Sequence, residues 1–444
     1  MPMKIKKILL PTIFVLTFGY IHWVAAQQPQ TSVEQSTAEK LSKEAGAAYY
    51  RQEYAKSAAL YQQAVAKGAR DTDTIYNAAC STALAGDKET AFRYLNKAIA
   101  AGFRSTDHLK RDPDLNSLHD DARWAKAIAA SEAQQAKYIK DHGDPIKTRF
   151  ITEDIARFWQ AYDQAMAAKS EERAAIFQRL YVDPGTVGLK DFKQSGRLDA
   201  KKLTQTIERS QAFFNAIRPT TLSLNNQRAE TIAAFRKLKS IYPDAIFPDA
   251  YFVIGQLQSG GTASDNGLLM GAEMFTRVAN VPMDGFSEWL KTGLMEPTEI
   301  PPLVTHESVH FQQKYPLQGG LLCNCLKEGS ADFLGELASG RLVKRMQDTH
   351  VWANTREREL WEQFQKDMPV ANSTSRWLYG SSGGNGRPVD LGYWMGYKIS
   401  EAHYKNSADK KQAVRDILIV KDCQQLLKVS RYAEKFAANT SSQK

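Results

Sequence analysis

The pattern of apolar and polar residues along the chain predicts a mainly helical protein. Between residues 36 and 128, and again between 152 and 242, small and apolar residues recur every three or four positions, as on amphipathic helices. A turn at 183–185 interrupts the second region. One run, Ala250 to Gly255, is continuously apolar and predicts a strand. We therefore expect a mainly α fold with a small sheet.

The first helical region contains a repeat with a period of 34 residues. Three positions of similar chemistry return 34 residues later, at Ser57 and Ala91, Tyr61 and Leu95, and Ala64 and Ala98. This period, with small residues where helices pack, resembles the tetratricopeptide repeat. The resemblance implies antiparallel helix pairs. They would either bind a protein partner in a groove or, because so few units are present, serve as a packing module.

The first residues of the chain have the three parts of a secretory signal. A positive segment at 4–7 precedes an apolar run at 8–18, and small residues lead up to Ala26. An uncleaved anchor is the alternative, but Pro11 and Gly19 disfavour a spanning helix. We expect cleavage after Ala26, no lipid anchor because no cysteine follows, and a periplasmic or secreted protein that is not inserted in the membrane.

Length and charge change this picture only in part. The 444 residues exceed one small domain, so we expect a signal at 1–26, helical repeats at 27–140 and a second domain at 141–444. With 43% hydrophobic and 24% charged residues, general disorder is excluded. The net charge of +9 includes three lysines of the signal, and no dense basic run follows. We therefore expect no nucleic-acid partner.

The clearest chemical pattern is His306-Glu307-x2-His310. Prolines just before it favour the first turn of a helix, and Pro316 ends that helix. Histidines four residues apart on a helix project from one face and can bind the same zinc ion, while Glu307 points toward a water in the fourth position. The pattern predicts a zinc site.

A second helical segment supplies a candidate third ligand. Glu328 and Asp332 are four residues apart within an apolar helical pattern, so they share a face. One carboxylate can bind zinc while the other accepts a hydrogen bond from a ligating histidine and fixes its tautomer. A solvated helix face is the alternative, but the neighbouring residues are apolar or small.

At this point the chain resembles the gluzincin metallopeptidases, the thermolysin-like group. Residues 150–404 also look like a bacterial family of predicted zinc-dependent proteases. The resemblance implies an α+β zincin-like metallopeptidase domain with a small edge sheet, built from the strand at 250–255 and the glycine-rich run after it. A hairpin is the alternative for that run. The resemblance implies these roles: zinc ligands His306, His310 and Glu328, general base Glu307, and Asp332 as the partner of His306.

A zinc peptidase also needs a donor for the oxyanion of its tetrahedral intermediate. Four downstream residues could supply it, and packing is the alternative for the tyrosines. They are Tyr393, which we favour, Tyr397, His403 and Arg387.

Three cysteines lie near or beyond the proposed third ligand. Cys323 and Cys325 are too close in sequence to bridge each other without strain. Either one can pair with Cys423 in an oxidising compartment, or all three can stay free thiols.

The function expected from these residues is zinc-dependent hydrolysis of peptide bonds in a peptide or protein substrate, with Zn²⁺ as cofactor. Two alternatives stay open. The zinc domain can be catalytically silent in a protein-binding scaffold, or the same residues can hydrolyse a non-peptide amide.

Overall fold

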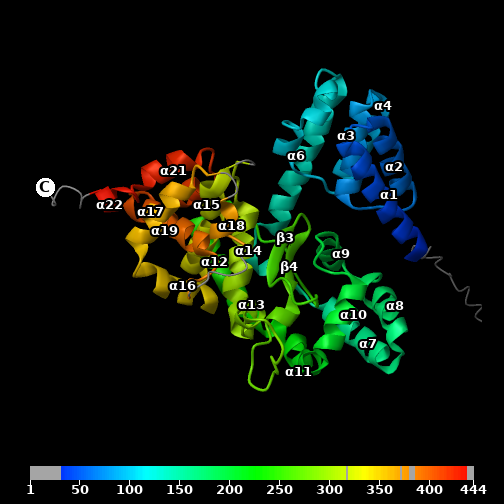
Figure 1. Cartoon of the computed structure of the whole chain (residues 1–444). Helices are drawn as coiled ribbons and strands as arrows, with labels where there is room; N and C mark the ends of the chain where they lie inside the picture. The colour runs from blue at the N-terminus through cyan, green and yellow to red at the C-terminus, as the bar shows by residue number, and fades with distance from the viewer. Residues whose placement is uncertain (1–31, 317–318, 371–372, 380–385, 438–444) are drawn as a thin grey trace, which may run out of the picture. The chain divides into compact units, whose positions relative to one another are not determined.

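The structure is a computed structural model that describes residues 32–316, 319–370, 373–379 and 386–437 (Figure 1). The predicted signal and its cleavage site lie outside these residues. The chain divides into two compact units: the first contains the chain up to Phe103 together with Asp112–Trp124, and the second contains the rest. The predicted boundary at residue 140 lies near the end of the long helix α6 (Ala122–His142), whereas the compact units divide at Trp124.

The first unit consists of paired helices. They are α1 (Ser32–Tyr50), α2 (Tyr54–Ala66), α3 (Thr72–Leu84) and α4 (Lys88–Ala100), followed by the short helix η1 (Pro113–Leu118). Helices α2 and α4 begin 34 residues apart, at Tyr54 and Lys88, so the structure has the period found in the sequence. Asp71 and Asp87 cap α3 and α4, because their side chains accept bonds from backbone N–H groups of the first turn.

Small side chains let these helices approach each other. Ser57 of α2 is fully buried, and its hydroxyl donates to the carbonyl oxygen of Ala45 in α1 and lies 2.9 Å from the hydroxyl of Ser81 in α3. Ala64, Leu95 and Ala98, three of the repeat positions, are also fully buried. A repeat-like helical region therefore accounts for the first unit.

The second unit contains a small sheet among helices. Within the described residues, β1 (Phe150–Ile151), β2 (Ala250–Val253), β3 (Gly261–Ser264) and β4 (Gly267–Gly271) form one sheet in the order β1-β2-β4-β3. Strand β2 is parallel to β1 and β4, whereas β3 is antiparallel to β4. The predicted strand is thus interior, and the two edges of the sheet are β1 and β3, of which β3 comes from the glycine-rich run.

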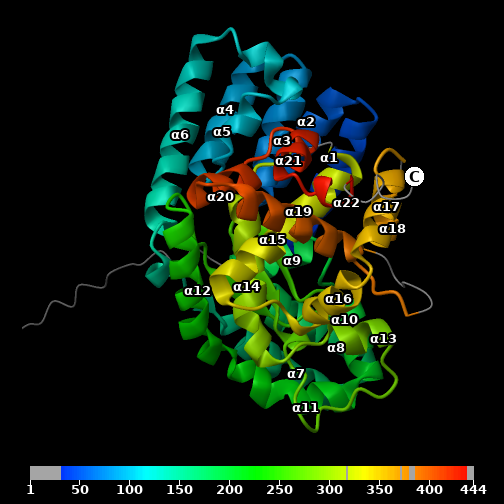
Figure 2. The same cartoon turned by 90° about the vertical axis from the view of Figure 1, so that its left-hand side faces the viewer.

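Helices make up most of the second unit (Figure 2). The α-helices are α5 (Thr106–Leu109), the remainder of α6, α7 (Glu153–Ala167), α8 (Ser170–Phe177), α9 (Val187–Gln194), α10 (Ala200–Arg209), α11 (Gln211–Leu222), α12 (Arg228–Ile241), α13 (Glu288–Gly293), α14 (Ile300–Gln312), α15 (Gly320–Ser339), α16 (Lys344–Asn354), α17 (Glu357–Asp367), α18 (Thr374–Trp377), α19 (Leu391–Asn406), α20 (Lys410–Leu418), α21 (Cys423–Ser430) and α22 (Glu434–Ala437). The short helices are η2 (Pro145–Lys147), η3 (Gln178–Val182), η4 (Leu224–Gln227), η5 (Ala272–Met274) and η6 (Pro297–Glu299). The mainly helical fold with a small sheet is as expected, while its assignment to a zincin-like domain stays a prediction.

Helix α15 lies between two apolar clusters. Ala331 and Leu334 belong to the cluster that includes the sheet and α7–α12, whereas Leu322 and Leu326 belong to the cluster around α17, α19 and α21. The backbones of α15 and α19 touch: a Cβ atom on Gly396 would lie 1.7 Å from the carbonyl oxygen of Cys325. Glycine is therefore needed where these helices cross.

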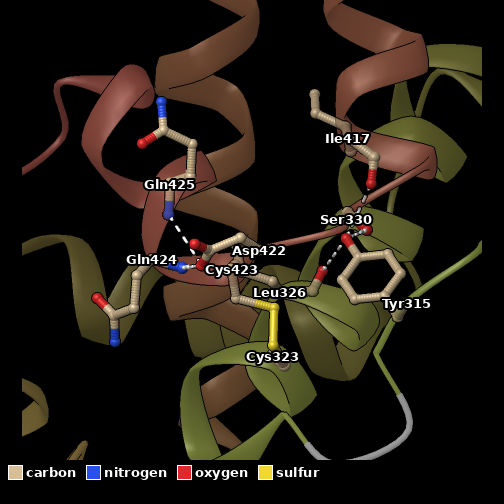
Figure 3. Close-up of a disulfide and its surroundings, with 9 residues drawn as sticks. All are labelled: Tyr315, Cys323, Leu326, Ser330, Ile417, Asp422, Cys423, Gln424 and Gln425. Atoms are coloured by element: carbon tan, nitrogen blue, oxygen red, sulfur yellow. Dashed lines mark hydrogen bonds between the residues drawn. A yellow bond between two sulfur atoms is a disulfide. The ribbon is translucent and has the colours of Figure 1, made fainter.

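A disulfide also holds α15, on the side of the second apolar cluster. Cys323 in α15 is bonded to Cys423, the first residue of α21 (Figure 3). Cys325 is a buried free thiol, so of the alternatives left open by the sequence the structure shows the Cys323–Cys423 pair. The bond closes a loop with a sequence separation of 100 residues.

We expect Cys423→Ser to lower the free energy of unfolding by about 2–5 kcal/mol under oxidising conditions, because the unfolded chain gains the entropy of the opened loop. Denaturant titration with and without dithiothreitol measures this. Under reducing conditions the variant and the wild type should nearly coincide. Equal stability of the two proteins under oxidising conditions would contradict the prediction.

Candidate metal centre

Helices α14 and α15 carry the residues that the sequence singled out. Pro301 and Pro302 occupy the start of α14, where they cost no helical hydrogen bond. The helix ends at Gln312, and α15 packs against it. Gly335 of α15 faces His306: a Cβ atom there would lie 3.5 Å from the Cα atom of His306. This close packing turns the polar faces of the two helices toward each other.

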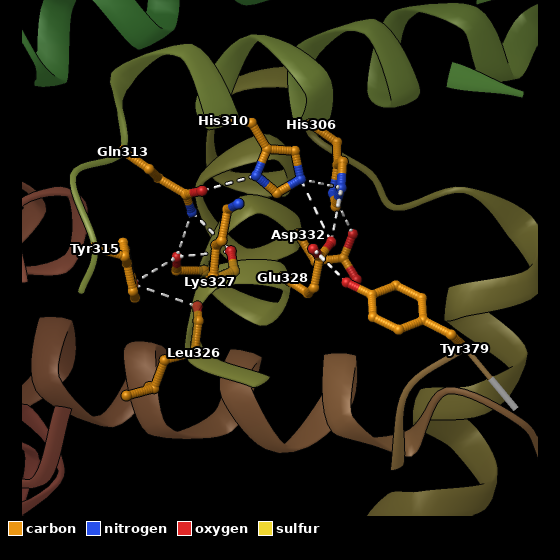
Figure 4. A network of polar contacts seen from close by, with 10 residues as sticks. His306, His310, Gln313, Tyr315, Leu326, Lys327, Glu328, Asp332 and Tyr379 are labelled. Atoms are coloured by element: carbon orange, nitrogen blue, oxygen red, sulfur yellow. Dashed lines mark hydrogen bonds and ion pairs between the residues drawn. The ribbon is translucent and has the colours of Figure 1, made fainter. Parts of the chain in front are cut away.

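Two histidines and one carboxylate converge between these helices (Figure 4). The Nε2 atoms of His306 and His310 lie 3.1 Å apart. Glu328 Oε2 lies 3.4 Å from His310 Nε2 and 3.9 Å from His306 Nε2. All three side chains are buried or half-buried, and their ligand atoms lie within 4.8 Å of one another. The structure thus brings together the three predicted ligands.

Each histidine is oriented through its other ring nitrogen. His306 Nδ1 lies 2.8 Å from Asp332 Oδ1, and His310 Nδ1 lies 2.7 Å from Gln313 Oε1. Because a carboxylate and an amide oxygen only accept hydrogen bonds, both Nδ1 atoms carry the proton. When both rings are neutral, their Nε2 lone pairs point to the same place.

Gln313 has a role that sequence analysis missed. Its amide nitrogen donates to the carbonyl oxygen of Lys327 and to the hydroxyl of Ser330, both in α15, so the Oε1 atom is directed at His310. The only available signal was its place three residues after His310, directly after the helix ends.

The electrostatics of the cluster favour a positive charge. Burial by itself lowers the pKa of His306, but Asp332, Glu307 and Glu328 outweigh it and raise this pKa to about 9. Burial by itself raises the pKa of Glu328, because it disfavours the charged carboxylate. His310, His306 and Tyr379 outweigh this effect and lower the pKa of Glu328 to about 2. Three buried carboxylates around two imidazoles therefore stabilise a cation.

The donor set fits a zinc ion. Nitrogen and oxygen ligands lie about 2.0–2.2 Å from zinc, so two ligands of a tetrahedral ion lie about 3.3 Å apart. The contacts of 3.1 and 3.4 Å are close to this separation, and the contact of 3.9 Å needs only a small side-chain shift. Two Nε2 atoms 3.1 Å apart need a cation between them, which is either a proton carried by His306 or a metal ion. Metal binding itself stays a prediction.

Glu307 lies on the same helix beside the two histidines. Burial raises its pKa, although His306 and His310 oppose the effect. Among the described residues, its carboxylate has no hydrogen-bond partner. The edge strand β3 lies against it: a Cβ atom on Gly261 would be 2.8 Å from Glu307 Oε1. Glycine at that position leaves room for the carboxylate.

Only one of the four proposed oxyanion donors lies beside the histidines. The ring of Tyr393 is stacked 6.2 Å from the ring of His306. Tyr397 donates to Glu336, His403 pairs with Asp416, and Arg387 donates to Gln363. The hydroxyl of Tyr397, the imidazole of His403 and the guanidinium of Arg387 are thus engaged in other contacts.

A second tyrosine, not predicted, reaches the site from another segment. The hydroxyl of Tyr379 donates to Glu328 Oε1 over 3.0 Å (Figure 4). Asp390 holds this residue, because its carboxylate accepts from the Tyr379 backbone N–H over 2.8 Å and pairs with Arg345. Tyr379 has a left-handed backbone conformation, with φ of 59°. No local sequence pattern predicts such a contact.

These groups open into a cavity of about 420 Å³. His306, Glu307 and Asp332 form one part of its wall, and Tyr379 and Tyr393 form another. Glu328 and His310 are not among the lining residues. A small molecule or one segment of a polymer therefore has access to His306 and to Glu307.

The fold and site define a mainly helical protein with a candidate mononuclear metal centre. A family model described as gliding motility protein GldB matches residues 136–434, about two thirds of the chain. The chain therefore belongs to the GldB family. No curated protein and no solved structure matches it.

The family match corrects the resemblance stated from the sequence. The chain is not a member of a gluzincin-type zinc-protease family, since the matching family is GldB and no protease family matches. The class label of metalloprotease, which rested on that resemblance, is therefore wrong as well, whereas the family match does not address which reaction the site itself carries out. The physical reason is that two helices packed face to face produce the His-Glu-x2-His and Glu-x3-Asp spacings locally. Such a local pattern does not specify the rest of a fold.

Family membership also bears on location. The matching family model is named for lipoproteins. This name indicates an extracytoplasmic protein, in agreement with the location expected from the N-terminal segment. The name differs from our expectation of no lipid anchor, which rested on the absence of a cysteine directly after Ala26. In the described part of the chain, no helix is both long and apolar enough to cross a bilayer.

We expect Asp332→Asn to weaken zinc binding about 10–100-fold, because the amide no longer supports the imidazole of His306 as a charged acceptor does. Competition with a chromophoric chelator measures the affinity. Glu336→Gln is the matched control: Glu336 lies one turn further along α15, lines the same cavity and bonds Tyr397 instead of a histidine. An unchanged affinity in Asp332→Asn would contradict the assigned role.

Proposed function

We propose that the α14–α15 site binds one zinc ion through His306, His310 and Glu328 and hydrolyses amide bonds, with peptide bonds as the substrate class. The observation that carries this proposal is Glu307. Its carboxylate lies on the cavity wall beside the proposed ligands, where a purely structural metal site has no need of a carboxylate. Its raised pKa and its place beside the ligands suit a general base.

Zinc at this position would polarise the substrate carbonyl and lower the pKa of its bound water to about 7. The protein's own contribution is proton transfer by Glu307. The carboxylate accepts a proton from the attacking water as the carbon–oxygen bond forms. It then delivers that proton to the departing nitrogen as the carbon–nitrogen bond breaks. Asp332 and Gln313 keep both imidazoles in one tautomer throughout.

Glu307→Gln should retain one equivalent of zinc and lose hydrolysis by about 10²–10⁴-fold, since the amide fits the space but cannot accept the proton. Metal analysis of protein purified without chelators and cleavage of a mixed peptide library measure the two properties. Absence of zinc from the wild type would overturn the site. Equal cleavage by both proteins would overturn the role of Glu307.

Tyr379 and Tyr393 are the two hydroxyls that can stabilise an oxyanion here. We expect Tyr379→Phe to lower kcat about 10²–10³-fold, because its hydroxyl lines the cavity and can exchange its hydrogen bond to Glu328 for one to the oxyanion. Tyr393→Phe is the paired control and should lose less, since its contact with His306 is ring stacking. The reverse order would assign the donor role to Tyr393.

Family membership favours a second function, which we propose independently: the protein acts with a protein partner in an extracytoplasmic gliding machinery. The helical repeats of the first unit are the candidate partner surface. In a gliding host, Glu307→Gln separates the two functions. Motility that survives the loss of hydrolysis indicates a scaffold whose zinc domain is catalytically silent for gliding. Joint loss, with zinc and stability retained, indicates that gliding depends on the hydrolysis.

A further inference from the structure

A buried carboxylate lies beside the sheet, outside the proposed ligand set. Glu273 belongs to η5, directly after β4, and its side chain is fully buried. Its Oε2 atom accepts a hydrogen bond from the backbone N–H of Gly255 over 2.8 Å, and its Oε1 atom accepts one from the backbone N–H of Leu257 over 3.2 Å. In the described part of the chain, no ion pair involves Glu273. The carboxylate therefore ties the backbone of one segment to η5.

This segment, residues 255–261, connects β2 to β3. Leu257 has a left-handed backbone conformation, with φ of 61°, and its side chain is buried. Leucine rarely takes this conformation, so the surrounding contacts have to hold it there. A Cβ atom on Gly255 would lie 2.8 Å from Glu273 Oε1, so the backbone approaches the carboxylate as closely as glycine allows. Glu273 is thus placed to hold the turn at Leu257.

Further contacts fix the same segment beyond this turn. Gln256 Oε1 accepts from the backbone N–H of Asp199 over 3.2 Å, and the Gln256 amide nitrogen donates to Gln258 Oε1 over 2.9 Å. The backbone N–H of Gly271 donates to the carbonyl oxygen of Gly260 over 3.1 Å. The path of the segment from β2 to β3 is therefore well defined.

The segment ends against the proposed general base. A Cβ atom on Gly261, the first residue of β3, would lie 2.8 Å from Glu307 Oε1 and 3.0 Å from Glu307 Cγ. The backbone at Gly261 therefore packs along the Glu307 side chain and limits its rotation. Gln258 and Gly260 also line the cavity. A shift of this segment would change both the cavity wall and the place of the Glu307 carboxylate.

We propose that Glu273 is a positioning residue for Glu307: it fixes residues 255–261, and these hold the Glu307 carboxylate in its place beside the histidines. This inference rests on the proposed function, in which Glu307 transfers the proton. Glu273 does not line the cavity, so it touches no reacting group. Its effect on the reaction is transmitted by the backbone between Leu257 and Gly261.

The first test measures how firmly the segment is held. Glu273→Gln keeps the size of the side chain but replaces one acceptor oxygen by an NH₂ group, so one of the two backbone N–H groups loses its partner. We expect amide hydrogen exchange at Gly255 or Leu257 to become on the order of 10–100-fold faster, which matches the loss of a hydrogen bond to a charged group. Amides of α19 report global opening and should exchange as in the wild type. Glu336→Gln is the matched control, because Glu336 bonds Tyr397 on another wall of the cavity, and it should leave both amides unchanged.

The second test observes Glu307 without metal or catalysis. In protein labelled with ¹³C at the glutamate side-chain carboxyl groups, the Glu307 signal is identified by its absence in Glu307→Gln. Glu273→Gln should shift this signal, because the carboxylate changes its surroundings. Gly255→Ala should shift it as well, since its Cβ atom would collide with the Glu273 carboxylate and displace the same segment without removing a charge. Glu336→Gln again serves as the control.

The third test measures the reaction. Glu273→Gln should lower kcat per bound zinc on the order of 10²-fold, the loss expected when a reacting group is misplaced by about 1 Å. KM and the zinc content should change little. A merely structural role would lower the amount of folded, zinc-loaded protein and leave kcat per bound zinc unchanged.

These tests separate the inference from the function on which it rests. A shifted Glu307 signal in Glu273→Gln, without hydrolysis by the wild type, supports the positioning and counts against the proposed hydrolase. Hydrolysis by the wild type, with an unchanged Glu307 signal and an unchanged kcat per bound zinc in Glu273→Gln, supports the hydrolase and overturns the positioning role. Unchanged exchange at both Gly255 and Leu257 also overturns it.

Discussion

The packing of α14 against α15 is the constraint on which the rest of the second unit depends. It places two imidazoles and Glu328 within 3.1–3.9 Å of one another, although burying such groups is unfavourable unless they are paired. Each histidine is therefore tied to the neighbouring structure through Nδ1. On its other side, α15 is held by the glycine crossing with α19 and by the disulfide to α21. The ligand geometry is thus set by backbone packing and not by loops.

The small sheet matters because of its edge. Strand β3 begins at Gly261, where a side chain would collide with Glu307, and at the preceding Gly260 a side chain would collide with Met295. A minor element of the fold thus leaves the space that the Glu307 carboxylate occupies.

Helical periodicity allowed the placement of His306, His310, Glu328 and Asp332, because their spacings put them on helix faces that must be buried together. Gln313 lies past the end of a helix, where periodicity gives no direction. Tyr379 comes from a segment 51 residues after Glu328, in a left-handed conformation. Strand β1 has two residues, too few for an alternating pattern, and so the interior position of β2 was not predicted. The local motifs also did not identify the family.

Family and site answer different questions about this protein. The family name points to gliding motility and to a place outside the cytoplasm, but it says nothing of chemistry. The candidate site suggests a reaction, but it says nothing of where in the cell that reaction would take place. Glu307 faces the cavity and not the protein interior alone, so water can reach its carboxylate and its burial costs less than that of a group sealed in the core. The residue is thus compatible with a scaffold as well, and the reaction proposed for it depends on the loss expected in Glu307→Gln.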